Sequence, residues 1–313
     1  MSKLTLYKGE RVTLMACSSC NAKCNDCYIG YNGNRDPNEL FEIAKSLTNN
    51  GKHVRIDGAE VLTNLDYLKT LKLVGQNWIM TNGLRLYQEP SVIDLLKKYG
   101  INTVYMSYHF GIQDVINSIP SLIVEEVIKR LKAADFNIYL NCTLTNKNYK
   151  DIAQYAHQAY VMGAKGIGFN KIFQQGKATD ISELDMNNLQ LLEFFKLLNE
   201  VRSQYDPNEF YITRGGSLGH DLFTGKDNFK CNAGHNHIMI TPDSNVYCCN
   251  SMCKAGYEIG KFHDGEIYIY EEFQHDESIC LAELLGFLNE NTIDSVNSQD
   301  FPKLVKKYQK LKK

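Results

Sequence analysis

"RVTLMACSSCNAKCNDCY" (residues 11–28) joins a short β-branched, apolar run to four cysteines within eleven positions. The run at 11–16 has the composition of a buried strand. Five similar runs follow, and longer amphipathic segments with helical periodicity separate them. Six β/α units without an obvious return strand predict an α/β fold, a partial (β/α)6 TIM-like barrel with its helices outside. The five later strands are expected at 53–57, 77–81, 103–109, 137–143 and 166–170.

The pattern changes toward the C-terminus. A longer helix is expected at about 185–204, followed by the strand-like "EFYITRG". From Cys231 onward, short segments alternate with turn residues, and a helix is expected near 279–290. We therefore predict a barrel domain with the following helix at 1–225, and a small cysteine-rich subdomain with C-terminal helices at 226–313.

Composition limits the possible partners and location. The 313 residues carry 34 Lys and Arg against 36 Asp and Glu, so the overall charge does not favour a nucleic-acid or membrane partner. No apolar run approaches the roughly 20 residues of a membrane span, and "MSKLTLYKGER" lacks the apolar core of a signal peptide. The sequence predicts a cytoplasmic protein. Only about ten residues precede the first strand, so we expect no N-terminal peptide-recognition domain.

The ten cysteines indicate two thiol-rich sites. In a reducing cytosol, closely spaced cysteines more often bind metal or act in catalysis than form disulfides. Cys20, Cys24 and Cys27 form CxxxCxxC, while Cys17 and Cys20 form a competing CxxC. Thiolates favour zinc or an iron–sulfur cluster. A closed zinc site needs four ligands, whereas three thiolates on a [4Fe–4S] cluster leave one iron open.

"CNAKCNDCY" after a first β-strand resembles the signature of the radical S-adenosylmethionine (radical SAM) superfamily. The resemblance implies that Cys20, Cys24 and Cys27 hold a [4Fe–4S] cluster whose open iron chelates S-adenosyl-L-methionine. It also implies reductive cleavage of that cofactor to a 5′-deoxyadenosyl radical, which abstracts hydrogen from a substrate. Asp26 stands where the family usually has an aromatic residue, with Tyr28 just after it.

Three more family-like motifs end the next three predicted strands in the expected order. "DGAE" ends the second strand, where the family usually has GGE followed by proline; here Val61 stands in place of the proline. "TNG" ends the third strand and "SYH" the fourth, while Asn141 lies on the fifth. The resemblance implies cofactor contacts from Tyr28, Gly58, Ala59, Glu60, Thr81, Asn82, Gly83, Ser107 and Asn141.

"CNAGHNHIMITPDSNVYCCNSMCKAGYEIGKF" (231–262) resembles the SPASM extension of radical SAM maturases in its halved form, called twitch. Ser244 stands where glycine is usual in the turn. The resemblance implies one auxiliary [4Fe–4S] cluster. Its expected ligands are Cys231, Cys249, Cys253 and Cys280. The alternative is a structural zinc held by Cys231, Cys253 and either His235 or His237.

Cys248 and Cys249 are adjacent in what reads as a strand, so their side chains should point to opposite faces. With Cys249 as a ligand, Cys248 is the spare thiol and a candidate hydrogen donor to a substrate radical. A shift of one residue in the alignment exchanges the two roles. The alternative is that the spare cysteine is buried and inert.

The leading hypothesis is a radical SAM enzyme that modifies a carbon of a ribosomal peptide or a small natural product. The paired cysteines favour an epimerase over a maturase that forms thioether or C–C crosslinks. Such an enzyme would need an external electron donor such as flavodoxin or ferredoxin. The alternatives from other classes are a zinc-stabilised binding or regulatory protein and an iron–sulfur electron carrier or sensor.

Overall fold

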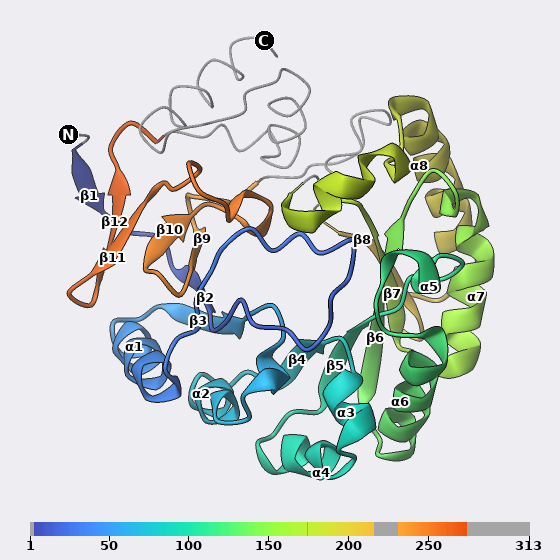
Figure 1. The fold of residues 1–313 in the computed structure, drawn as a ribbon, viewed down its shortest axis with the longest axis horizontal. Coiled ribbons are helices and arrows are strands. Elements are labelled where there is room, and N and C mark those ends of the chain that lie inside the picture. The colour runs from blue at the N-terminus through green and yellow to red at the C-terminus, as the bar shows by residue number, and fades with distance from the viewer. Residues whose placement is uncertain (1–2, 174, 216–230, 274–313) are drawn as a thin grey trace.

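A parallel partial barrel forms the body of the computed structural model, which describes residues 3–173, 175–215 and 231–273 (Figure 1). The six predicted strands are confirmed, and a further strand, β8, pairs parallel with β7. These strands are β2 (Arg11–Met15), β3 (His53–Asp57), β4 (Trp78–Thr81), β5 (Thr103–Ser107), β6 (Asn137–Leu144), β7 (Gly166–Lys171) and β8 (Tyr211–Arg214).

Helices cover the outside of the barrel (Figure 1). Asp36 begins the first of them because its carboxylate accepts hydrogen bonds from the amides of Asn38 and Glu39. Asn187 and Gln190 form a capping box at the start of the helix at Asn188–Arg202. The helices are α1 (Pro37–Asn49), α2 (Tyr67–Leu73), α3 (Leu84–Gln88), α4 (Ser91–Lys98), α5 (Gln113–Ile116), α6 (Ser121–Ala133), α7 (Ile152–Met162) and α8 (Asn188–Arg202), with short 3₁₀ turns η1 (Val61–Thr63), η2 (Tyr149–Asp151), η3 (Gly176–Leu184) and η5 (Asn250–Met252).

Alternation along the strands separates a buried outer face from a half-open inner face. On β6 the residues Ile138, Leu140 and Cys142 are fully buried, whereas Tyr139 and Asn141 between them are only half-buried. The same alternation holds on β5. Because successive side chains of a strand point to opposite faces, the apolar set packs under the helices and the polar set lines the barrel interior.

A side chain bridges the gap between β3 and β4, which do not pair along a ladder. The buried amide of Gln76 accepts a hydrogen bond from Ile56 N at 2.8 Å and donates to the Ile56 and Trp78 carbonyls at 3.0 Å each. Gln76 therefore satisfies backbone groups that a neighbouring strand would otherwise pair.

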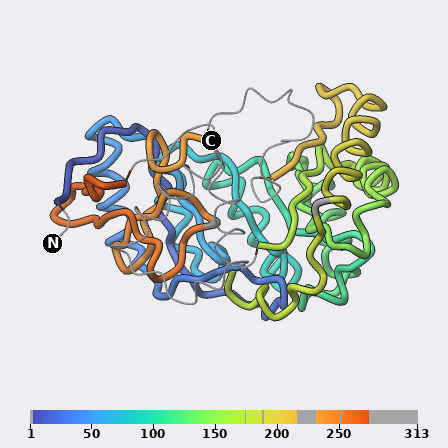
Figure 2. Tube along the Cα trace, turned by 90° about the horizontal axis from the view of Figure 1, so that it is seen from above, coloured from blue at the N-terminus to red at the C-terminus, as the bar shows by residue number. Residues whose placement is uncertain are grey.

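The C-terminal strands continue the barrel sheet on its other side. β9 (His237–Ile240) pairs parallel with β2, and antiparallel strands β10 (Asn245–Tyr247), β11 (Gly260–His263) and β12 (Glu266–Tyr270) follow. β1 (Leu4–Leu6) pairs with β12, so the first strand lies beside the last (Figures 1 and 2). The sheet thus crosses the predicted division at residue 225, and the two-domain organisation stays a prediction.

The turn between β9 and β10 holds Ser244 in an uncommon backbone conformation. Ser244 adopts φ +64°, the left-handed conformation that glycine favours. Asp243 supports the turn by accepting a hydrogen bond from the Thr241 hydroxyl at 2.5 Å. The predicted helix near 279–290 lies outside the described residues. None of the helices in the described ranges has the length and apolar character needed to cross a bilayer.

Candidate functional site

The three thiols of the CxxxCxxC motif, Cys20, Cys24 and Cys27, share the loop that leaves β2 at the carboxyl end of the barrel strands. Cys20 is exposed, and Cys24 and Cys27 are half-buried. Partial burial raises the pKa of the Cys20 thiol to about 11 and also raises that of Cys24; neighbouring thiols contribute to both shifts. Ala22 N donates a hydrogen bond to Cys20 Sγ at 3.4 Å. The loop therefore groups these thiols on the face where parallel β/α proteins bind ligands.

Glu60 forms the centre of a buried network at the same strand ends. Its side chain follows β3 and is 1% exposed. Its carboxylate accepts hydrogen bonds from Asn82 N at 2.7 Å, the Thr81 hydroxyl at 3.0 Å and Leu62 N at 3.1 Å. Burial raises the pKa of Glu60 to about 7 in spite of these donors. A carboxylate held in this way fits a cationic or N–H group of a ligand.

Asn82 connects this network to the thiol loop. Its side-chain amide donates to Cys20 Sγ at 3.4 Å and to Asn21 Oδ1 at 2.9 Å. Gly83 follows with φ +82°, which lets the chain turn directly into α3. The structure thus brings together residues of the first, second and third strand ends, as the separate motifs predicted.

The segment Gly58–Ala59 lies against the start of the thiol loop. Ala59 N donates to Cys17 O at 2.9 Å, and a Cβ on Gly58 would stand 2.9 Å from Cys17 Sγ. Cys17 is 1% exposed, and its thiol donates to the Glu60 carbonyl at 3.5 Å. Cys17 is therefore a buried packing residue, which disfavours a closed zinc site made by Cys17 together with Cys20, Cys24 and Cys27.

Ser107, at the end of β5, and Asn141 of β6 are register partners on the inner wall. Gly168 pairs with Asn141 on the other side, and a Cβ there would stand 3.2 Å from Asn141 Oδ1. Glycine at this position therefore leaves room for the Asn141 side chain. Cys142, the next residue, is fully buried on the outer face.

Asp26, which replaces the usual aromatic residue, is paired with a buried histidine. Its Oδ2 lies 3.2 Å from His109 Nε2, and the two side chains are 12% and 6% exposed. Thr143 N donates to His109 Nδ1 at 2.9 Å, so the ring proton sits on Nε2 and points at Asp26. Burial lowers the pKa of His109 and raises that of Asp26. The pair ties the thiol loop to the end of β5.

Tyr28 joins the thiol loop to the C-terminal cysteine region. Its ring lies 4.9 Å from the Phe173 ring, and its hydroxyl accepts a hydrogen bond from Asn250 Nδ2 at 3.1 Å. The Gln175 amide donates to Tyr28 O at 2.8 Å and Cys253 O at 3.4 Å. Tyr28 therefore lies between the two thiol groups.

The second thiol group gathers around η5. Cys248 is fully buried, and its pKa is raised first by burial and then by the nearby Cys249, Cys253 and Cys231. Cys249 is half-buried. The prediction that the two adjacent cysteines lie within a strand is wrong, because β10 ends at Tyr247 and both lie in the bend that follows. Cys249 also lies near Cys253, so both adjacent cysteines belong to this group. Cys280 lies outside the described residues.

The chemistry of the side chains at the strand ends fits an iron–sulfur cluster and S-adenosyl-L-methionine more closely than their spacing does. No three Cys, His, Asp or Glu side chains in the described ranges stand close enough together to enclose a metal ion. The hydrogen-bond donors that contact Cys20 Sγ nevertheless suit a metal-bound thiolate. The buried Glu60 carboxylate suits the amino group of a bound cofactor.

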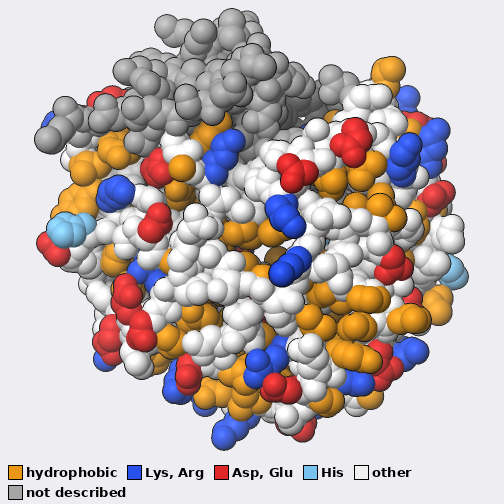
Figure 3. All heavy atoms as spheres, in the orientation of Figure 1, with side chains coloured by type: hydrophobic (Ala, Val, Ile, Leu, Met, Phe, Trp, Pro, Cys, Tyr) orange, Lys and Arg blue, Asp and Glu red, His pale blue; other side chains and the backbone are white. Residues whose placement is uncertain are grey.

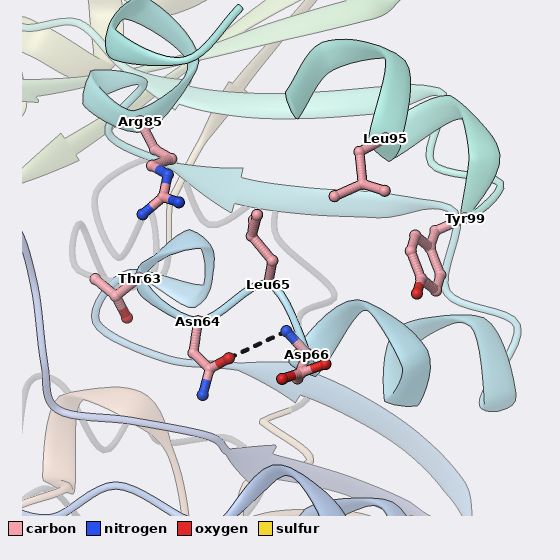
Figure 4. A pocket seen from close by; sticks show the side chains of 7 residues that line it. All are labelled: Thr63, Asn64, Leu65, Asp66, Arg85, Leu95 and Tyr99. Carbon is pink, nitrogen blue, oxygen red and sulfur yellow. Dashed lines mark hydrogen bonds between the residues drawn. The ribbon is translucent and has the colours of Figure 1, made fainter. Parts of the chain in front are cut away.

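A separate pocket of about 400 Å³ opens on the outer side of the barrel (Figure 4). Residues of the η1–α2 segment, α3 and α4 line it, and no cysteine does. The pocket therefore does not belong to the strand-end site. Its lining residues are Thr63, Asn64, Leu65, Asp66, Arg85, Leu95 and Tyr99.

Comparison with solved structures identifies the fold. SuiB from Streptococcus suis, bound to its precursor peptide SuiA, matches 78% of this chain with a TM-score of 0.63 and 14% identity. The enzyme anSMEcpe with bound AdoMet matches 82% with a TM-score of 0.60 and 17% identity. This chain spans 60% of the SuiB chain and 78% of the anSMEcpe chain. No protein-family model and no curated protein sequence matches.

The chain therefore has the fold of the radical SAM enzymes to which these neighbours belong, a partial barrel with a mixed α/β architecture. At identities below a fifth, the likeness establishes the fold alone.

Two parts of the site were not predicted from the sequence. The Asp26 and His109 pair joins residues 83 positions apart, and no motif connects them. Gln175 and Asn250 hold Tyr28 through contacts between three distant segments. The only sequence signal was Asp26 itself, a carboxylate at an expected aromatic position.

Proposed function

We propose that this protein is a radical SAM enzyme that abstracts hydrogen from a carbon of a peptide. The observation that carries the proposal is the network in which Asn82 contacts both Glu60 and Cys20. It unites three motifs whose joint presence a zinc-binding or electron-carrier protein does not require. When bound, the [4Fe–4S] cluster and S-adenosyl-L-methionine would supply the 5′-deoxyadenosyl radical.

The chain's own residues would bind and orient these groups. Cys20, Cys24 and Cys27 are the proposed cluster ligands, and Asn82 donates to Cys20 Sγ. Glu60, held by Thr81 and Asn82, is the proposed acceptor for the methionine amino group. Gly58, Ala59, Gly83, Ser107, Asn141 and Tyr28 remain the proposed lining of the cofactor site.

A peptide substrate is supported by the structural neighbours. SuiB is seen with the precursor peptide SuiA, and anSMEcpe with the Cp18Cys peptide. We extend this substrate class to the present chain, together with an external electron donor such as flavodoxin or ferredoxin. The proposed auxiliary cluster uses Cys231, Cys253, Cys280 and one of the adjacent cysteines.

Epimerisation is the proposed reaction type, with one thiol of the adjacent pair as hydrogen donor. Cys248 is fully buried beside three other thiols, whereas Cys249, which also lies near Cys253, is half-buried and so the more accessible of the two. This arrangement favours the one-residue alternative, with Cys248 as cluster ligand and Cys249 as donor. In deuterated solvent, Cys249→Ala should abolish deuterium incorporation into an inverted peptide. Cys248→Ala should lower iron content. Crosslinked product from the wild type would establish the maturase alternative instead.

Iron content and low-temperature EPR of anaerobically reconstituted protein test the cluster assignment. We expect about eight irons in the wild type, and about four in a variant with Cys20, Cys24 and Cys27 changed to alanine. Only the wild-type signal should shift when S-adenosyl-L-methionine is added. Zinc in place of iron, or a signal indifferent to the cofactor, would contradict the proposal.

A further inference from the structure

Below the strand-end site, the inner wall of the barrel carries a connected set of side chains, here called the lumen wall: Arg55, Trp78, Met80, Tyr105 and Tyr139. The Arg55 guanidinium lies 5.3 Å from the Trp78 ring centre. The Trp78 and Tyr105 rings meet edge to face at 5.6 Å, and Tyr105 stacks on Tyr139 at 5.1 Å. One cation and three rings therefore run across four strands.

This wall faces an open interior. Met80 is 39% exposed although Ile79 beside it is 1% exposed, because the two side chains point to opposite faces of β4. The Arg55 side chain is 43% exposed, and Tyr105 and Tyr139 are half-buried. Figure 3, which shows the face seen in Figure 1, has a hollow near its centre with Lys or Arg side chains beside it. A ligand group can therefore reach the exposed parts of Arg55 and Met80.

Arg55 has hydrogen-bonding capacity that the protein does not use. Its Nη2 donates to Asp57 Oδ2 at 3.2 Å, and its Nε is buried without a hydrogen-bond partner. A guanidinium has five N–H donors arranged to grip a carboxylate through two of them. Asp57 is 5% exposed, so the exposed 43% of the Arg55 side chain lies away from this ion pair.

The charges of two arginines, Arg55 and Arg11, also act in the lower interior. The pKa of His237, which bonds to Thr13, falls to about 4 through burial and through the charges of Arg55 and Arg11. Burial and Tyr139 raise the pKa of Tyr105, while Arg55 acts to lower it. An anionic group placed here would gain from the same charges.

We propose that the lumen wall binds a carboxylate of the substrate peptide, with Arg55 as the anchoring residue. The stacked rings of Tyr105 and Tyr139 pack against the aliphatic carbons that carry the carboxylate. The inference rests on the proposed function, because it assigns the substrate group that the barrel interior receives. It narrows the substrate to peptides with an acidic side chain or a C-terminal carboxylate near the reacting carbon.

Trp78 reports on this site because it is the only tryptophan of the chain and Arg55 lies over its ring. The probes are N-acetyl-L-glutamic acid α-amide for a side-chain carboxylate and N-acetyl-L-alanine for a terminal one. N-acetyl-L-glutamine amide is the neutral control. Reconstituted wild-type protein should show a saturable, salt-sensitive change in Trp78 emission with at least one acidic probe. The probe that binds tighter identifies the source of the carboxylate.

The variants separate the role of Arg55 from general effects. Arg55→Gln should lower the affinity for the acidic probe by about tenfold or more, because a charged hydrogen bond is lost. Arg55→Lys should lower it by less, because that hydrogen bond is only reduced. Arg130→Gln is the matched control: Arg130 also lies over a ring, that of Tyr87, but on α6. It should leave probe binding unchanged.

Equal binding of the neutral probe, or unchanged binding in both Arg55 variants, would overturn the carboxylate site. Formation of 5′-deoxyadenosine is measured separately on the same preparations. Cofactor cleavage without acidic-probe binding would refute the lumen-wall inference and leave the proposed function intact. Probe binding without cofactor cleavage would refute the proposed function and support the carboxylate site.

Discussion

Glu60 should make the stability of the metal-free protein depend on pH. Its pKa of about 7 lies above the ordinary value of 4.5, because burial penalises the charged form. Between these values the folded protein keeps a proton that the unfolded chain loses, so stability falls as pH rises. This decline amounts to at most about 3 kcal/mol and should be missing in Glu60→Gln.

Urea unfolding of wild type and variant at pH 4 and pH 8 measures this difference. Glu42→Gln, at an exposed carboxylate, is the control and should follow the wild type. A parallel decline in Glu60→Gln and wild type would show that another group titrates.

The Asp26 and His109 pair should contribute more than a surface ion pair. Asp26→Ala leaves the buried Nε2–H of His109 without its acceptor, at a cost of about 1 to 3 kcal/mol. Asp66→Ala, which removes an exposed pair with Lys69, should cost about 0.5 kcal/mol or less. Chemical denaturation measures both. A cost for Asp26→Ala no larger than the control would mean that the loop is held in another way.

At the scale of elements, Gln76 is the residue on which the β3–β4 junction depends. Gln76→Ala leaves buried backbone groups of Ile56 and Trp78 unpaired, so we expect a loss of about 2 to 4 kcal/mol in unfolding free energy. Gln88→Ala, at an exposed position on α3, should change it by about 0.5 kcal/mol or less. A loss within the control range would show that the junction needs no bridging amide.

Elements with a strong local pattern were predicted from the sequence, and those fixed by distant pairing were not. The six β/α units have clear periodicity, and the motifs at their ends met as expected. β1 has three residues and forms only because β12 lies beside it. Likewise, "EFYITRG" reads as a strand, but its place next to β7 depends on the whole barrel. Gln76 and His109 carry no local signal because their partners come from other segments.

At the scale of the whole molecule, the N-terminal strand should hold the C-terminal sheet in place. Tyr7 N donates to Ile267 O and Glu271 N to Lys3 O, each at 2.8 Å. Deleting residues 1–6 should raise amide exchange in β11 and β12 by about tenfold or more and leave β5 to β7 unchanged, because local openings are cooperative within a unit. Hydrogen exchange with mass spectrometry measures this. Unchanged protection of β12 would show that β1 is dispensable.

The central claim is that the strand-end site cleaves S-adenosyl-L-methionine. Its most direct test is 5′-deoxyadenosine formation by reconstituted protein under dithionite, without oxygen. The account predicts the product with wild type and with Cys142→Ala, whose thiol lies on the outer face of β6. It predicts none with Cys20, Cys24 and Cys27 changed to alanine. No product from iron-loaded wild type, or equal product from the triple variant, would contradict it.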